Sequence, residues 1–191
     1  PGDDVISLLL TSEVDGERLT DDEVTFVSIL LVLAGIDTTW STLGAAIHHL
    51  ATHSADQARL RAEPALLPAA CEEFLRAYAP VTVARQVAAD TLLGGEQLSK
   101  GDMILVSFPS ANRDETVFER PNEVILDRAN NRHLAFGSGI HRCLGIHFAR
   151  MELLVGLREL LRRVPPFTLD GDVTWARGQV RRPRHLPIRF S

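Results

Sequence analysis

The sequence predicts a mainly α fold with a small antiparallel β portion. One observation is a long apolar stretch over residues 24–51, in which Asp37 is the only charged side chain. Another is the change to β-branched, alternating apolar residues with glycine turns over residues 81–108, which is typical of strands. The chain has 191 residues, 45% hydrophobic and 24% charged, and these proportions exclude a disordered chain or a coiled-coil rod.

The longest predicted helix covers about residues 21–52. Thr20 and Glu23 have the spacing of a capping box, which marks a helix start. Gly35 and the polar residues 37–39 favour a helix least, which indicates a place where the helix opens or approaches another group closely. The other predicted elements are helices over 4–10, 55–62, 66–78 and 146–163, a sheet over 81–108, a long connection over 110–132 and short strands over 167–190.

The long apolar helix also has the length of a membrane span, which needs about 20 residues. Asp37 opposes that interpretation, because an ionised carboxylate in the middle of a span costs about 2.5–3.5 kcal/mol. A helix that is apolar nearly all round is equally typical of the centre of a large soluble protein. We therefore expect no membrane span, and we expect Asp37 to be a buried acid.

The overall charge argues against a polyanionic partner. The net charge is −5, so the chain has no general attraction for nucleic acid or anionic lipid. The arginines of residues 177–189 are interrupted by prolines and lack interleaved aromatic residues, so we interpret them as a solvated edge. Two cysteines are too few for a disulfide-rich secreted scaffold, and the first residues do not resemble a signal peptide. We expect a cytoplasmic protein.

The most informative stretch is a glycine-punctuated loop from Phe136 to Gly145, which carries Cys143 and leads into a helix. The positive end of the helix dipole and its unpaired N–H groups favour a thiolate at such a position. Three interpretations compete: a structural cysteine, a zinc site, and a thiolate ligand of haem iron. The haem interpretation also explains the glycines and the aromatic residue, since a macrocycle needs close backbone approach and an apolar face. The zinc site would use His133, His141, Cys143 and His147, whose spacing is not typical of zinc sites.

Phe136-x-x-Gly139-x-His141-x-Cys143-x-Gly145 resembles the haem-binding signature of the cytochrome P450 family, the haem-thiolate monooxygenases. Three other segments are similar to motifs of this family and occur in the same order. They are 34–39 (AGIDTT), similar to the oxygen-activation motif; 73–76 (EFLR), similar to the E-x-x-R motif; and 127–136, similar to the meander before the cysteine loop. The resemblance covers essentially all 191 residues.

The resemblance implies a role for each matching residue. Asp37 and Thr38 would be catalytic, with Asp37 relaying protons and Thr38 donating a hydrogen bond to dioxygen. The alternative for Thr38 is a bond back to a helix carbonyl. Arg85 and His141 would hold the haem propionates, and Cys143 would be the iron ligand. The residues implied to bind the cofactor are Ala34, Arg85, Phe136, Gly137, His141, Cys143, Gly145 and Ala149.

Two further groups of residues follow from the same resemblance. Glu73 and Arg76 lie three residues apart on a helix, which by itself predicts a surface ion pair worth less than about 1 kcal/mol. The family resemblance instead implies a buried structural network that also includes Arg128. Residues 81–83 (Val81, Thr82 and Val83) resemble the segment that lines the substrate pocket.

The implied function is insertion of one oxygen atom from O₂ into a hydrophobic small molecule, with haem b as cofactor. The electrons would come from a ferredoxin or a flavoprotein reductase. Peroxide-driven oxygenation and a non-catalytic haem-binding fragment or remnant are the alternatives. The motifs belong to the C-terminal half of the family's fold, so we expect residues 1–191 to be the haem-ligating portion of one larger monooxygenase domain.

Overall fold

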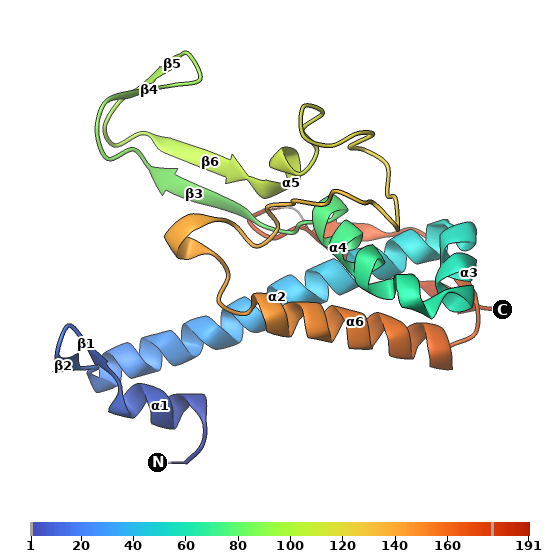
Figure 1. Cartoon of the computed structure of the whole chain (residues 1–191), viewed down its shortest axis with the longest axis horizontal. Helices are drawn as coiled ribbons and strands as arrows, with labels where there is room; N and C mark the ends of the chain where they lie inside the picture. Colours follow the sequence, from blue (N-terminus) through green and yellow to red (C-terminus); the bar gives the residue numbers. More distant parts are fainter. Residues whose placement is uncertain (1, 177) are drawn as a thin grey trace. The chain divides into compact units, whose positions relative to one another are not determined.

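The computed structural model describes residues 2–176 and 178–191 and confirms the predicted mainly α class (Figure 1). The chain divides into two compact units, with the boundary after Asp37 inside the long helix. The helices are α1 (Val5–Thr11), α2 (Asp21–Thr52), α3 (Ser54–Ala62), α4 (Leu67–Ala77), α5 (Phe108–Ala111) and α6 (Ile146–Arg163), with short 3₁₀ turns η1 (Pro64–Leu66) and η2 (Gly139–His141).

Within residues 2–176 and 178–191 the strands form five small antiparallel pairs, which confirms the predicted small antiparallel β portion, although the β1–β2 pair was not predicted. The β3–β6 pair is the longest and aligns Thr82 with Ser107 and Gln86 with Met103. The β4–β5 hairpin connects these two strands (Figure 1). The pairs are β1 (Glu13–Val14) with β2 (Glu17–Arg18), β3 (Thr82–Gln86) with β6 (Met103–Ser107), β4 (Thr91–Leu93) with β5 (Glu96–Leu98), β7 (Phe167–Leu169) with β10 (Ile188–Phe190), and β8 (Thr174–Ala176) with β9 (Arg182–His185).

The first unit contains α1, the β1–β2 hairpin and the start of α2. Asp15 and Gly16 form the hairpin turn, and both have positive φ angles, of 54° and 86°. At the start of α2 the Thr20 N–H donates to Glu23 Oε2 at 2.8 Å, and the Glu23 N–H donates to Thr20 Oγ1 at 3.3 Å. These two bonds are the capping box that the sequence predicts.

The core of the second unit lies between the end of α2 and helices α3, α4 and α6. Leu50 of α2, Phe74 of α4 and Leu157 of α6 are completely buried and belong to one apolar cluster. Gln57 of α3 fastens this cluster to the C-terminal strands, since its Nε2 donates to the carbonyls of Leu50 and Phe167, both at 2.9 Å. One face of α4 therefore packs into this core, and the same helix carries the charged residues Glu72, Glu73 and Arg76.

The middle of α2 is exposed, and this corrects one expectation. Ile29, Leu33 and Ile36 are 54%, 64% and 57% exposed, and Asp37 is only half-buried. Asp37 is therefore not the buried acid that the sequence predicts, because the described residues lay few side chains against this part of the helix. By length and composition α2 could cross a membrane, and 11% of its most apolar window is buried.

Candidate functional site

The cysteine loop turns back on itself just before α6. The Cys143 N–H donates to the Phe136 carbonyl at 2.9 Å, and the Gly137 N–H donates to the Leu134 carbonyl at 2.9 Å. Gly137 and Gly139 have φ angles of 67° and 71°, which side chains with a Cβ rarely adopt. Two of the glycines are thus required by the turns that bring Cys143 to the front of α6.

Cys143 is exposed and lies among exposed apolar side chains. Ile140 is 97% exposed, Leu144 is 86% exposed and Phe148 is 59% exposed. A Cβ added at Gly139 would meet no atom within 4 Å, so the loop is open at that position. A soft sulfur ligand with exposed apolar side chains near it in the sequence suits a flat apolar macrocycle that contains iron. The residues present therefore fit a haem.

The zinc alternative fails on the position of His133. The Ala135 N–H donates to His133 Nδ1 at 3.2 Å, and His133 Nε2 lies 3.2 Å from Glu72 Oε2. Both ring nitrogens are therefore used within the protein. Across residues 2–176 and 178–191, no group of three or more His, Cys, Asp or Glu side chains could hold a metal ion.

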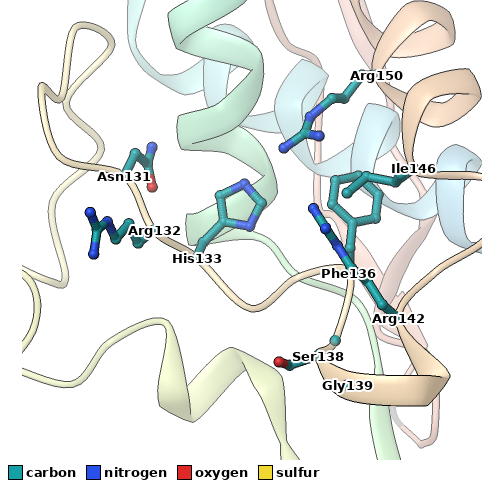
Figure 2. Close-up of a pocket in the computed structure, with 10 residues that line it drawn as sticks. Asn131, Arg132, His133, Phe136, Ser138, Gly139, Arg142, Ile146 and Arg150 are labelled. Atoms are coloured by element: carbon teal, nitrogen blue, oxygen red, sulfur yellow. The ribbon is translucent and has the colours of Figure 1, made fainter.

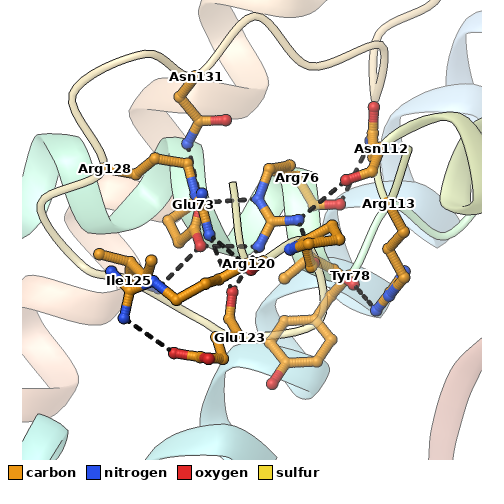
Figure 3. A network of polar contacts seen from close by, with 12 residues as sticks. Glu73, Arg76, Tyr78, Asn112, Arg113, Arg120, Glu123, Ile125, Arg128 and Asn131 are labelled. Atoms are coloured by element: carbon orange, nitrogen blue, oxygen red, sulfur yellow. Dashed lines mark hydrogen bonds and ion pairs between the residues drawn. The ribbon is translucent and has the colours of Figure 1, made fainter. Parts of the chain in front are cut away.

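Glu73 and Arg76 form a completely buried pair on α4 (Figure 3). Arg76 Nε and Nη2 donate to the two Glu73 oxygens, each at 2.8 Å, and Arg128 Nε donates to Glu73 Oε2 at 2.9 Å. The Ile125 N–H and Asn131 Nδ2 supply two more bonds, at 2.8 and 3.0 Å. Burial by itself raises the pKa of Glu73, but the hydrogen bonds from Arg76 and Arg128 outweigh it and lower the pKa. The structure thus brings the three predicted network residues together.

The two guanidinium groups of this network also hold the long connection that precedes the cysteine loop. After α5, residues 112–138 contain neither helix nor strand, so their carbonyls need other donors. Arg76 and Arg128 supply such donors across the connection (Figure 3). Arg76 donates to the carbonyls of Asn112, Pro121 and Glu123, and Arg128 to those of Glu119, Arg120 and Glu123.

Asn112 fixes the far end of this connection, and sequence reasoning did not assign it a role. Its Nδ2 donates to the Arg76 carbonyl at 3.3 Å, and its Oδ1 accepts from the Leu134 N–H at 2.7 Å. The side chain is completely buried. Asn112 therefore joins the end of α4 to the residues just before Phe136.

A second ion-pair network lies next to the first, and sequence reasoning missed it as well. Arg150 of α6 donates to both oxygens of Glu72, each at 2.7 Å, and its guanidinium lies 5.1 Å from the centre of the Phe136 ring. Burial raises the pKa of Glu72, but the hydrogen bonds from His133 and Arg150 and the charge of Arg150 outweigh it and lower the pKa to about 2. The signal in the sequence was the second acid beside Glu73, together with an arginine one turn into α6.

A pocket of about 530 Å³ opens beside the cysteine loop (Figure 2). Arg150 is already paired there, whereas Arg132 and Arg142 are exposed and make no side-chain hydrogen bond or ion pair with the described residues. The pocket mouth therefore carries two positive charges that no described residue neutralises. Its lining residues are Asn131, Arg132, His133, Phe136, Gly137, Ser138, Gly139, Arg142, Ile146 and Arg150.

The predicted residues on α2 fall on either side of the unit boundary. Ala34 is exposed and Asp37 half-buried in the first unit, and Thr38 is half-buried in the second. The Thr42 hydroxyl donates to the Thr38 carbonyl at 3.1 Å, so one threonine of this region does bond back along the helix.

The other predicted residues are spread over the second unit. Arg85 is exposed, and its Nη1 donates to the Ala84 carbonyl at 2.8 Å. His141 lies exposed in η2, and Ala149 is half-buried in α6. Val81, Thr82 and Val83 are half-buried, and Val81 forms a bridge with Val180. No hydrogen bond or ion pair among the described residues joins Arg85 to His141.

Comparison with known proteins gives a consistent picture. The family model "Cytochrome P450" matches residues 2–170. The chain is 40% identical to "Cytochrome P450-terp" of Pseudomonas sp, covering 100% of this chain and 45% of that protein. It is 43% identical to a "Steroid C26-monooxygenase" of Mycobacterium tuberculosis, covering 90% of this chain and 46% of that protein. The chain spans about half the length of the curated relatives it matches.

Solved structures agree with these relatives. The bacillaene polyketide synthase cytochrome P450 PksS of Bacillus subtilis 168 superposes with a TM-score of 0.94 at 36% identity, covering 100% of this chain and 51% of that one. CYP109E1 of Bacillus megaterium, solved with testosterone, superposes with a TM-score of 0.91 at 38% identity, covering 98% and 53%.

Replacing Glu73 by Ala should lower the free energy of unfolding by about 3–5 kcal/mol, because it leaves Arg76 buried without its counter-charge. Denaturant titration measures this change. The matched control is Glu159→Ala, which removes an exposed Glu–Arg pair of the same i,i+3 spacing, with Arg162. Water already solvates Glu159, so its loss should change the stability far less. Equal effects of the two substitutions would show that the Glu73 network does not stabilise the fold.

The contribution of Glu72 to stability should depend on pH. Its folded pKa lies below the ordinary value of 4.5, so the stabilisation is present above pH 4.5 and is lost as the pH falls toward about 2. Glu72→Gln should therefore be less stable than wild type at pH 7 and approach it in acid. Glu96→Gln is the control, because Glu96 is exposed and its loss should change the stability at pH 7 far less than the loss of Glu72. A difference for Glu72→Gln that does not vary with pH would contradict the assignment.

Proposed function

Because the chain belongs to the cytochrome P450 family, we propose that it forms the haem-ligating portion, residues 1–191, of a single monooxygenase domain. The exposed thiol of Cys143 carries this proposal, since it stands in a glycine loop among exposed apolar side chains. Members of the family bind haem b. When bound, the haem supplies the activation of dioxygen, which the electron-rich thiolate ligand favours.

Residues of the loop and of neighbouring elements would hold the haem. Cys143 is the iron ligand, and Arg85 and His141 donate to the propionates. The Arg85 guanidinium suits this role because it is exposed and has donors left over after its one bond to a carbonyl. The remaining contacts come from Ala34, Phe136, Gly137, Gly145 and Ala149.

Asp37 and Thr38 manage protons in the proposed reaction. The Asp37 side chain is half-buried on α2, so part of it still reaches water, from which it relays protons. The Thr38 hydroxyl donates a hydrogen bond to dioxygen or holds a water molecule. An intact acid–alcohol pair favours dioxygen with a reductase over peroxide as the oxidant.

The two networks on α4 are structural in this proposal. Glu73, with Arg76 and Arg128, fixes the connection before the cysteine loop, while Glu72 and Arg150 hold the loop itself against α4 and α6. Together they keep Cys143 in one position without touching substrate.

The substrate in this proposal is a hydrophobic small molecule. The apolar side chains of Val81 and Val83, together with Thr82, line its pocket. Two similar proteins are named or titled for steroids, which supports an apolar substrate class.

The electron donor in this proposal is a ferredoxin or a flavoprotein reductase, which docks its acidic side chains at the pocket of Figure 2. Arg132 and Arg142 support this, because neither forms an ion pair with a residue in the part of the chain that the structure describes. We place the protein in the cytoplasm and interpret α2 as an interior helix, because an ionised Asp37 at mid-helix opposes a membrane span.

The two cysteines provide a direct test of the iron ligand. Reduced, CO-bound wild type should show the absorption band of thiolate-ligated haem, and Cys143→Ser should lose it. Cys71→Ala should keep the band, because Cys71 is buried in the core. Retention of the band in Cys143→Ser, or a wild type without it, would refute the proposal. A wild type that shows the band but gives no product with a reductase system would be a haem-binding remnant.

Reversing the charge of Arg142 should slow electron transfer. We expect Arg142→Glu to lower the rate of reduction by a ferredoxin about tenfold at low salt, and the rate should also become less salt-dependent. Arg158→Glu is the control, since Arg158 is exposed on α6 outside the pocket. Equal rates and equal salt dependence in wild type and Arg142→Glu would exclude docking at this pocket.

A further inference from the structure

A third polar chain lies outside the two networks on α4 and joins three helices. It consists of His49 of α2, Asp56 of α3 and Tyr78, the residue that follows α4. His49 Nδ1 lies 2.8 Å from the Tyr78 hydroxyl, and His49 Nε2 lies 2.7 Å from Asp56 Oδ2. The His49 side chain is 3% exposed, so water does not compete for these bonds.

The direction of each hydrogen bond follows from the chemistry of the partners. An ionised Asp56 can only accept, so His49 Nε2 carries the proton and donates it. In the neutral ring Nδ1 then accepts from the Tyr78 O–H. Burial raises the pKa of Tyr78 to about 12, so its hydroxyl remains a donor. The two hydrogen bonds therefore run in one direction, from Tyr78 through His49 to Asp56.

Tyr78 stands where α4 ends and the chain turns toward β3. Its N–H donates to the Phe74 carbonyl at 2.9 Å, which closes the last turn of the helix. Farther on, the Arg181 N–H donates to the Pro80 carbonyl at 2.8 Å, and the Thr82 N–H donates to the Gln179 carbonyl at 3.0 Å. The segment that leads to Val81 is thus held by Tyr78 on one side and by residues 179–181 on the other.

We propose that Asp56, His49 and Tyr78 are positioning residues, which fix the end of α4 so that Val81 and Val83 stand correctly on the wall of the substrate pocket. The inference rests on the proposed function for the role of this wall. It connects the shape of the pocket to the C-terminal end of α2, through side chains that touch neither haem nor substrate.

The chemistry of His49 makes this arrangement sensitive to acid. Protonation turns Nδ1 into a donor, so the Tyr78 hydroxyl would have to change from donor to acceptor and this hydrogen bond would reverse its direction. His48 and His53 lower the pKa of His49, with the His53 ring stacked on His49 at 4.0 Å, while Asp56 is the carboxylate that raises it. On the side of α4, His49 faces Phe74 and Tyr78.

The direction of the pH effect follows from burial. Burial lowers the pKa of His49 below its ordinary value of 6.5, against the effect of Asp56. The unfolded chain therefore binds the proton more readily than the folded one. The stabilising contribution of the neutral His49 side chain is complete above about pH 6.5 and is lost as the pH falls below that value.

The test compares Tyr78→Phe with wild type in the haem-loaded protein, using imidazole and 4-phenylimidazole as probes. Both bind ferric haem through nitrogen, but only the phenyl ring reaches the pocket wall. We expect Tyr78→Phe to weaken 4-phenylimidazole about fivefold, the size of one lost hydrogen bond, and to leave imidazole unchanged. Amide hydrogen exchange at residues 81–83 should also accelerate.

Gln57→Met is the matched control. It removes the buried bonds of Gln57 to Leu50 and Phe167 but none to α4, so it should lower the melting temperature without changing the ratio of the two affinities. An unchanged ratio and unchanged exchange in Tyr78→Phe would overturn the inference, and so would an equal change of the ratio in Gln57→Met. A wild type without a thiolate-haem spectrum would refute the proposed function instead, and exchange at residues 81–83 would still test the positioning.

Discussion

The Glu73 carboxylate, buried with Arg76 on α4, is the interaction on which the site depends. Its two oxygens accept from two guanidinium groups, one backbone N–H and one side-chain amide, so these donors replace the hydrogen bonds that water would make to the carboxylate. Bringing an ion pair into the interior has a large desolvation penalty, which only such complete hydrogen bonding offsets. In return, the guanidinium groups replace secondary structure as donors for the connection before the cysteine loop.

The sequence predicts the regular elements well because their signals are local. The capping box of Thr20 and Glu23 marks the start of α2, and the helix predicted over 146–163 matches α6. The network of Glu73, Arg76 and Arg128 came from the family resemblance, because spacing alone indicates only a surface pair. Asn112 and Asn131 were missed because they reach α4 from loops, which leave no periodic pattern in the sequence. Glu72 was missed because its partner Arg150 lies on α6, far away in the sequence.

Burial along α2 shows a different limit of sequence reasoning. Apolar composition predicts that a helix will be covered, but it does not say which part of the polypeptide covers it. The end of α2, with Leu50 and His49, is packed against α3 and α4, whereas Leu33 and Ile36 remain exposed. Asp37 lies between these two environments, so its expected burial could not be derived from the helix alone.

Glu72 and Glu73 are neighbours in the sequence, but on a helix their side chains diverge by about 100°. One acid faces α6 and the cysteine loop, and the other faces the preceding connection. The rotation of α4 about its own axis therefore determines the direction of both side chains, and with it the geometry of the Glu72 and Glu73 networks. A single-residue insertion earlier in α4 would turn both acids away from their partners together, so the two networks depend on the length of this helix.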